Sequence, residues 1–200
     1  MPKEQAKKEK IGVQEALKDE ARVKTRLEKE ISDLLADYSR TLFILGQYDA
    51  GKLSKPKGRE ARFILEYGDC VRIINEIKKR LVVKKVSGDL FGNDAGSKFR
   101  GIIGNLYQTF DGQELYKTGE EKAAHLIYLT IKDHPFSDGN KRIASFIFVY
   151  FLDKNNFLFK NNGERKINDN ALVALALMVA ESDPQEKEVM IKIILNLLAE

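Results

Sequence analysis

The sequence predicts an all-α protein built around one buried helix, with a single small β-hairpin. Apolar residues recur every three or four positions along most of the 200-residue chain, which is the spacing of one face of a helix. The run Ile143–Leu152 is apolar at almost every position, and a helix that is apolar on all sides is surrounded by protein. Asp111-Gly112, between two short extended segments, is a strong signal for a tight hairpin turn.

The composition is that of one globular domain. Hydrophobic residues make up 43% of the chain, enough for a sizeable core. The 34 Lys and Arg nearly balance the 30 Asp and Glu, for a net charge of +4, so we do not expect nucleic-acid binding. A single cysteine, Cys70, excludes an internal disulfide, fits a reducing cytoplasm and is expected in the core. We expect no signal peptide and no membrane association, because the longest apolar run is too short to span a bilayer.

Residues 1–58 are predicted to form a helical extension, and residues 59–200 the main domain. The first 30 residues are rich in Lys and Glu, which is typical of a solvated helix or a frayed end. A stripe then follows that we expect to pack within the molecule, because it is too short for the sustained heptads of a coiled coil. Gly46 and residues 48–58 are expected to end this long helix in a loop. The stripe consists of Leu27, Ile31, Leu34, Leu35, Tyr38, Leu42 and Leu45.

After the extension, the apolar spacing predicts helices separated by polar or glycine-rich loops, one of them at residues 87–97. Thr118 and Glu121 have the spacing of a capping box that opens one of the helices. The hairpin is expected between Gln108 and Tyr116, and it needs a neighbour because a lone hairpin is barely stable. The helices are expected over residues 63–81, 99–110, 118–131, 143–152, 168–180 and 185–198.

The segment 134–142, HPFSDGNKR, carries the residues that point to chemistry. Pro135 disfavours helix at the residue before it, so the imidazole of His134 is predicted where a helix meets a loop. Phe136 is apolar among polar neighbours and is expected to anchor the loop in the core. Gly139 permits a backbone conformation in which amides converge on a ligand.

The buried helix begins directly after this loop. Its N-terminal N–H groups and the positive end of its dipole therefore face the loop, and they form a ready anion site. Lys141 and Arg142 are unusual at a helix N-terminus, and a bound phosphate would explain them. Asp138 offers the oxygen ligands that magnesium prefers, and His134 is able to take a proton from a hydroxyl near neutral pH.

The same segment resembles the active-site signature of the Fic/Doc (Fido) family, H-P-F-x-[D/E]-G-N-[G/K]-R, and every fixed position matches. The surroundings are also similar: one helix enters the motif, an apolar helix leaves it, and a hairpin lies upstream. The likeness covers roughly residues 59–198. Lys141 resembles the bacterial, death-on-curing-like subgroup. The resemblance implies a Fic-type helical bundle around a buried central helix.

The resemblance also implies an enzyme that uses ATP and Mg²⁺ to modify a hydroxyl on a protein. His134 would be the general base, Asp138 would bind the magnesium ion, and Arg142 would neutralise phosphate charge. Asn140, with the backbone around Gly139, would form the anion hole. In-line attack on phosphorus depends mainly on positioning and charge neutralisation, which this set would supply.

Two wider sets of residues follow from the resemblance. The hairpin would act as a flap that holds the protein substrate by adding it as a strand. The flap residues are Thr109, Phe110, Asp111, Gly112, Gln113, Glu114 and Leu115. The residues expected to contact the nucleotide are Phe136, Gly139, Asn140, Lys141 and Arg142.

Two departures from the family pattern leave the transferred group open. The AMP-transferring branch has Gly where this chain has Lys141, and commonly a second Arg where this chain has Ser145. A lysine fills space beside the phosphates, and a serine removes one phosphate clamp. The death-on-curing type, with its lysine, accompanies phosphate transfer, so AMP transfer and phosphate transfer both stay open.

Two functions other than enzymatic activity are also compatible with a helical domain of this kind. One is a catalytically silent module that keeps the fold for interaction or regulation, but the complete set His134, Asp138 and Arg142 favours activity. A nucleic-acid binder that uses the basic N-terminus is disfavoured because the charges there nearly cancel. An internal inhibitory helix, [S/T]-x-x-x-E-[G/N], is unsupported because Lys187 breaks the match at Ser182–Glu186. A separate inhibitory antitoxin and a homo-oligomer stay open.

Overall fold

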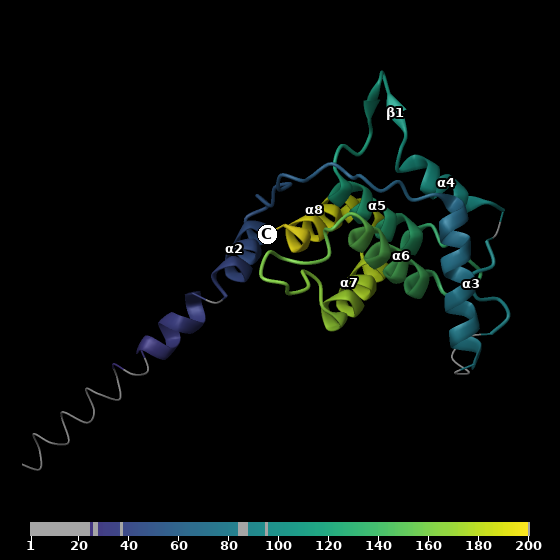
Figure 1. Ribbon diagram of the computed structural model, residues 1–200. Coiled ribbons are helices and arrows are strands. Elements are labelled where there is room, and N and C mark those ends of the chain that lie inside the picture. The colour runs from purple at the N-terminus through teal and green to yellow at the C-terminus, as the bar shows by residue number, and fades with distance from the viewer. Residues whose placement is uncertain (1–24, 26–27, 37, 84–87, 95, 200) are drawn as a thin grey trace, which may run out of the picture. The chain divides into compact units, whose positions relative to one another are not determined.

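The computed structural model describes residue 25 and residues 28–36, 38–83, 88–94 and 96–199 (Figure 1). The chain divides into two compact units, over residues 1–52 and 53–200. The second unit is mostly helical and holds one small two-stranded antiparallel hairpin, as the sequence predicts.

The first unit is helical over residues 28–36 and again in α2, Ser39–Asp49. Helical hydrogen bonds connect the two segments, because the Tyr38 N–H donates to the Leu34 carbonyl and the Leu42 N–H donates to the Tyr38 carbonyl, each at 3.0 Å. The helix continues past Gly46, where the sequence predicted its end, and the Gly46 carbonyl accepts from the Ala50 N–H at 3.1 Å. One glycine weakens a helix but does not end it when the hydrogen bonds on either side are made.

Within the first unit, no described element covers the apolar stripe, so its predicted packing within the molecule stays a prediction. Its six described side chains are 47–59% exposed, and none of the residues of α2 is buried. Periodicity shows that one face is apolar, but it does not show what covers that face. Leu27 lies outside the described residues. From here on, "the apolar stripe" denotes Ile31, Leu34, Leu35, Tyr38, Leu42 and Leu45.

The core of the second unit is centred on α5, Gly119–Lys132, and α6, Asn140–Lys154, which pack side by side (Figure 1). Most of the apolar run predicted to be central is buried, since Ile143, Ile147, Phe148 and Phe151 have no exposed surface. The prediction that protein surrounds this helix on all sides is wrong at Phe146, which is 52% exposed. Around this pair lie α3, Tyr67–Val83; α4, Lys98–Asn105; α7, Asp169–Glu181; and α8, Lys187–Leu198. Cys70 is fully buried, as expected.

In the second unit, the predicted capping box is confirmed and two predicted helix boundaries are wrong. The capping box forms, because the Glu121 N–H donates to Thr118 Oγ1 and the Thr118 N–H donates to the Glu121 carboxylate. The second predicted helix begins at Tyr67 instead of Phe63, because the buried amide of Asn155 accepts from the N–H groups of Arg62 and Phe63, each at 2.9 Å. The third predicted helix ends at Asn105 instead of residue 110, because the hairpin follows.

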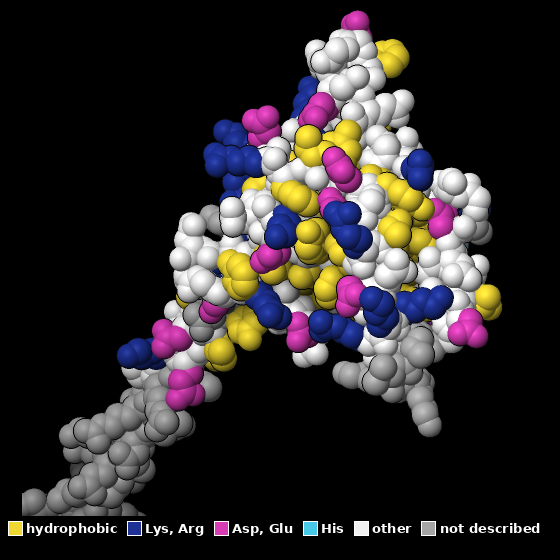
Figure 2. Space-filling model, turned by 45° about the vertical axis from the view of Figure 1, so that its right-hand side comes forward, with side chains coloured by type: hydrophobic (Ala, Val, Ile, Leu, Met, Phe, Trp, Pro, Cys, Tyr) yellow, Lys and Arg dark blue, Asp and Glu magenta, His cyan; other side chains and the backbone are white. Residues whose placement is uncertain are grey.

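The hairpin consists of β1, Thr109–Phe110, and β2, Gln113–Glu114, with Thr109 opposite Glu114. Asp111 and Gly112 both have positive φ, +51° and +76°, as a two-residue turn of this kind requires. A short 3₁₀ turn, Pro184–Glu186, precedes α8. On the face drawn in Figure 2, the described Lys and Arg side chains are interspersed with Asp and Glu. Each helix in the described part of the chain is too short or too polar to cross a bilayer.

Candidate active site

His134 lies directly after the end of α5, where Asp133 is the C-cap residue. Its φ is +45°, an uncommon value for a residue with a side chain, and its side chain is exposed while Pro135 behind it is buried. Nδ1 of His134 is 3.0 Å from the Lys132 carbonyl oxygen. When Nδ1 donates its proton to that carbonyl, Nε2 carries the lone pair. The backbone thus selects the tautomer in which Nε2 is the base.

The loop after His134 is held in place through both the side chain and the backbone of Phe136. The ring of Phe136 is buried and lies 4.8 Å from the ring of Phe99, centroid to centroid. The backbone of Phe136 is held by the side-chain amide of Asn140, whose Oδ1 accepts from the Phe136 N–H at 2.9 Å and whose Nδ2 donates to the Phe136 carbonyl at 2.7 Å. Asn140 thus fixes the shape of the loop at the start of α6.

Gly139 is the N-cap residue of α6 and has a φ of +89°. A Cβ at this position would lie 2.4 Å from Cε2 of Phe91, a fully buried ring. Because glycine brings no side chain, the start of α6 has no side-chain cap of its own. The N–H groups of its first turn, which no helical carbonyl is able to reach, face the loop.

Residues 91–94 lie against the motif, a contact that the sequence analysis missed. The Gly92 N–H donates to the Asp138 carbonyl and the Ser137 N–H donates to the Asn93 carbonyl, both at 3.0 Å. These bonds form two isolated β-bridges, Phe91 with Asp138 and Asp94 with Phe136. The glycines at 92 and 96 suggested only a loop, and no local signal shows which distant segment a loop will pair with.

Asp138 and Arg142 form an ion pair one helical turn apart. Nη2 of Arg142 is 3.0 Å from each carboxylate oxygen of Asp138, and its guanidinium carbon lies 4.8 Å from the centre of the Phe91 ring. Both side chains are about two-fifths exposed, so solvent or an incoming phosphate is able to reach them. Lys141 between them is exposed.

The motif lines one hollow of about 240 Å³. The sequence-predicted residues His134, Asp138, Gly139, Asn140, Lys141 and Arg142 all border it, together with Ser137. Phe136 lies beneath the loop and holds it in place. The hollow therefore combines an imidazole, a carboxylate, two cations and the N-terminus of a helix, which is a set able to bind phosphate and to accept a proton from a hydroxyl.

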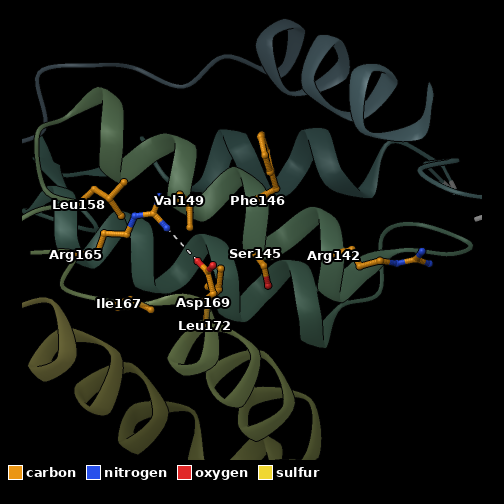
Figure 3. Close-up of a pocket in the computed structure, with 9 residues that line it drawn as sticks. All are labelled: Arg142, Ser145, Phe146, Val149, Leu158, Arg165, Ile167, Asp169 and Leu172. Carbon is orange, nitrogen blue, oxygen red and sulfur yellow. Dashed lines mark hydrogen bonds and ion pairs between the residues drawn. The ribbon is translucent and has the colours of Figure 1, made fainter. Parts of the chain in front are cut away.

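Arg142 also borders a second, larger pocket of about 360 Å³ (Figure 3). Most of its wall is apolar: Phe146, Val149, Leu158, Ile167 and Leu172. Arg165 and Asp169 in the same wall neutralise each other through an ion pair of 3.0 Å, the dashed line in Figure 3. Ser145 lies on α6 between Arg142 and the apolar end of this pocket (Figure 3).

The structure places the hairpin at the other end of α5 from His134. The hairpin joins the start of the helix, where the buried Lys122 ammonium donates to Glu114 Oε2 at 2.6 Å and to the Tyr116 carbonyl at 2.8 Å. His134 follows the end of α5, about 20 Å away for a helix of 14 residues. None of the predicted flap residues 109–115 borders the hollow, and the segment that pairs with the motif is 91–94. Their role in holding a protein substrate stays a prediction.

The residues and their geometry agree with one comparison against known proteins. The model of the Fic/DOC family matches residues 70–152. This match supports the Fic/Doc family for the part of the chain that runs from α3 through most of α6 and contains the whole motif. The chain has no significant match among curated proteins or among solved structures. Similarity to the Fic/Doc family is therefore supported by the family match over residues 70–152.

The residues around the hollow also bear on where a magnesium ion would be held. The part of the chain that the structure describes contains no cluster of three or more metal-binding side chains. Among the residues that border the hollow, Asp138 is the one carboxylate. Mg²⁺ commonly uses one or two carboxylates and completes its shell with substrate phosphates and water. Asp138 fits that use, provided that Arg142 moves from the carboxylate to the phosphates when they bind.

Proposed function

We propose that this protein transfers phosphate from ATP to a hydroxyl group on another protein. The observation that carries the proposal is the hollow at the start of α6, where His134, Asp138 and Arg142 surround helical N–H groups. The match to the Fic/Doc family supports modification of a protein as the general class of reaction.

The second pocket supports phosphate transfer over AMP transfer. A triphosphate bound at the start of α6 needs space on one side for its nucleoside. From Arg142 to Val149 the axis of α6 advances about 10 Å, which is comparable to the length of a nucleoside with its first phosphates. The pocket along this stretch is apolar, and its own charges are paired. It therefore suits a flat base better than a triphosphate, and the γ-phosphate then lies at the hollow.

In this arrangement each residue has one task. The hydroxyl oxygen of the target attacks the γ-phosphorus, the bond to the oxygen of the leaving ADP breaks, and Nε2 of His134 takes the hydroxyl proton. Arg142 and the N–H groups of α6 hold the phosphate oxygens, and Asn140 keeps the loop in the shape that positions His134. Magnesium bound by Asp138 would supply charge neutralisation of the phosphates.

The test compares two labels. The protein is incubated with a cell extract, Mg²⁺ and ATP labelled in either the α- or the γ-phosphate, and the label on proteins is measured. We expect label from the γ-position alone, and its loss in His134→Ala but not in the surface control Lys192→Ala. Label from the α-position would instead show AMP transfer. Absence of both labels would leave the silent module as the remaining reading.

The role of the second pocket has a separate test in binding. Val149→Trp fills the pocket without touching the hollow. We expect calorimetry to show at least a tenfold loss of ATP affinity in this variant but unchanged affinity for inorganic triphosphate, which has no base. Equal losses for both ligands, or none for either, would contradict the proposed orientation.

A further inference from the structure

We propose that the apolar stripe is the interface through which two copies of this chain associate. The stripe lies on two helical segments, residues 28–36 and α2, which meet at Tyr38, and its six side chains are about half exposed. Within the first unit, no described element covers it. Water-exposed apolar surface of this extent marks an interaction site in soluble proteins.

The spacing of the stripe fits another helix as its partner. Ile31, Leu35, Tyr38, Leu42 and Leu45 follow one another at alternating steps of four and three residues. This is the a and d spacing of a heptad, which keeps one seam of a helix facing another helix. Tyr38 is the N-cap residue of α2, and its N–H and carbonyl bond to the Leu34 carbonyl and the Leu42 N–H, so the seam passes at this residue from one helical segment to the next. Leu34 widens the ridge on one side.

The area available is that of a stable dimer. Six side chains that are each about half exposed, together with the neighbouring exposed Tyr48, offer on the order of 700 Å² per copy. A specific interface of standard size buries about 800 Å² on each partner. A second copy of the same helix is therefore able to cover the stripe almost completely.

The distribution of charge favours an identical copy over a charged partner. Two identical helices bring the same residues to the rim of their contact, so charged flanks of one sign would repel. Here Ser32, Ser39 and Thr41 border the seam. Asp33 and Arg40 lie on the opposite side of the helix, since each residue advances the helix by about 100°. The contact is consequently apolar, and its strength should depend little on salt.

Sedimentation equilibrium of the full 200-residue chain, over a wide range of concentration, tests the proposal. We expect the mass of a dimer, unchanged at high salt. The double variant Leu35→Glu/Leu42→Glu places two charges in the seam of each copy, and its mass should fall to that of a monomer. Phe43→Glu is the matched control, because Phe43 is 66% exposed but lies beside the stripe. This variant should stay dimeric.

Other occupants of the stripe give different results. A monomeric wild type whose amides at 31–45 are protected from hydrogen exchange would show that residues 53–200 cover the stripe, and it would overturn the proposal. A monomer without such protection would also overturn it, as would a dimer that persists in the double variant. Circular dichroism of each variant confirms that the helices are retained. None of these measurements depends on enzymatic activity, so the result stands apart from the proposed function.

Discussion

At the scale of single residues, Gly139 shows how one missing side chain shapes the site. Its φ of +89° is costly for any other residue, and a Cβ would approach Cε2 and Cδ2 of Phe91 at 2.4 and 2.6 Å. Phe91 has no exposed surface, so its ring has little room to move. The same ring contacts Arg142. A side chain at 139 would therefore disturb the anion site and the core together.

We expect Gly139→Ala to lower the free energy of unfolding by roughly 2–4 kcal/mol, the sum of backbone strain and overpacking. Gly112→Ala is the matched control, because Gly112 also has a positive φ, +76°, but nothing lies within 4 Å of the added Cβ. The control should lose only about 1 kcal/mol of backbone strain. Urea unfolding of both variants measures the difference. Equal losses would show that Phe91 does not oppose the substitution.

The candidate site was predictable at this scale wherever its residues are contiguous. His134, Asp138, Gly139 and Arg142 occupy nine consecutive positions, and the structure places them around one hollow. Phe91 was not predictable, because it lies in a distant loop and looks like any other core residue. A motif shows which groups the chemistry needs, but it does not show which distant side chain packs beneath them.

At the scale of elements, local signals predicted local structure well. The capping box of Thr118 and Glu121 and the turn at Asp111-Gly112 each depend on residues only a few positions apart, and both formed. Predicted helix boundaries were wrong where a residue distant in the sequence binds the backbone. The side-chain amide of Asn155 accepts hydrogen bonds from the N–H groups of Arg62 and Phe63 before α3, and it lies far along the chain from the helix that it shortens. The apolar stripe has the same limit, since its periodicity shows an apolar face but does not identify what covers that face.

The hairpin carries a prediction about its own attachment. The side chain of Lys122 is only 4% exposed, while that of Glu114 is 44% exposed. Glu114→Gln keeps the size of the side chain but removes the charge that compensates the buried ammonium. We expect this variant to lose about 1–3 kcal/mol of unfolding free energy, because two neutral oxygens, an amide and the Tyr116 carbonyl, compensate a buried ammonium less well than a carboxylate does.

Hydrogen exchange locates that effect. The Leu115 N–H donates to the Gln108 carbonyl at 2.8 Å and reports whether the hairpin is closed. Its exchange should accelerate in Glu114→Gln. Gln113→Ala, on the same exposed strand, should change the stability by less than about 0.5 kcal/mol. Wild-type exchange at Leu115 in the Glu114 variant would show that the ion pair does not hold the hairpin.

At the scale of the whole molecule, the core buries a histidine that makes the stability of the fold depend on pH. The side chain of His125 in α5 is 4% exposed, its ring stacks on Tyr116 at 3.8 Å, and Nδ1 is buried without a hydrogen-bond partner. Burial, helped by the charges of Lys187 and Lys55, lowers the pKa of His125 to about 3. The folded protein therefore holds this histidine neutral, whereas the unfolded chain protonates it near its ordinary pKa of about 6.5.

The sign of the pH dependence follows from this difference. Between about pH 6.5 and pH 3 the unfolded state binds one proton more than the folded state, so the contribution of His125 to stability is complete above pH 6.5 and is lost as the pH falls. The loss approaches about 1.4 kcal/mol per pH unit within that window.

Urea unfolding at several values between pH 7.5 and pH 4.5 tests this dependence. His125→Phe keeps a stacking ring but cannot be protonated, so its stability should fall less steeply with falling pH than that of the wild type. His134→Phe removes the other, exposed histidine and should keep the wild-type slope. If both variants instead follow the wild type, acid acts on this fold through its carboxylates and His125 has no part in it.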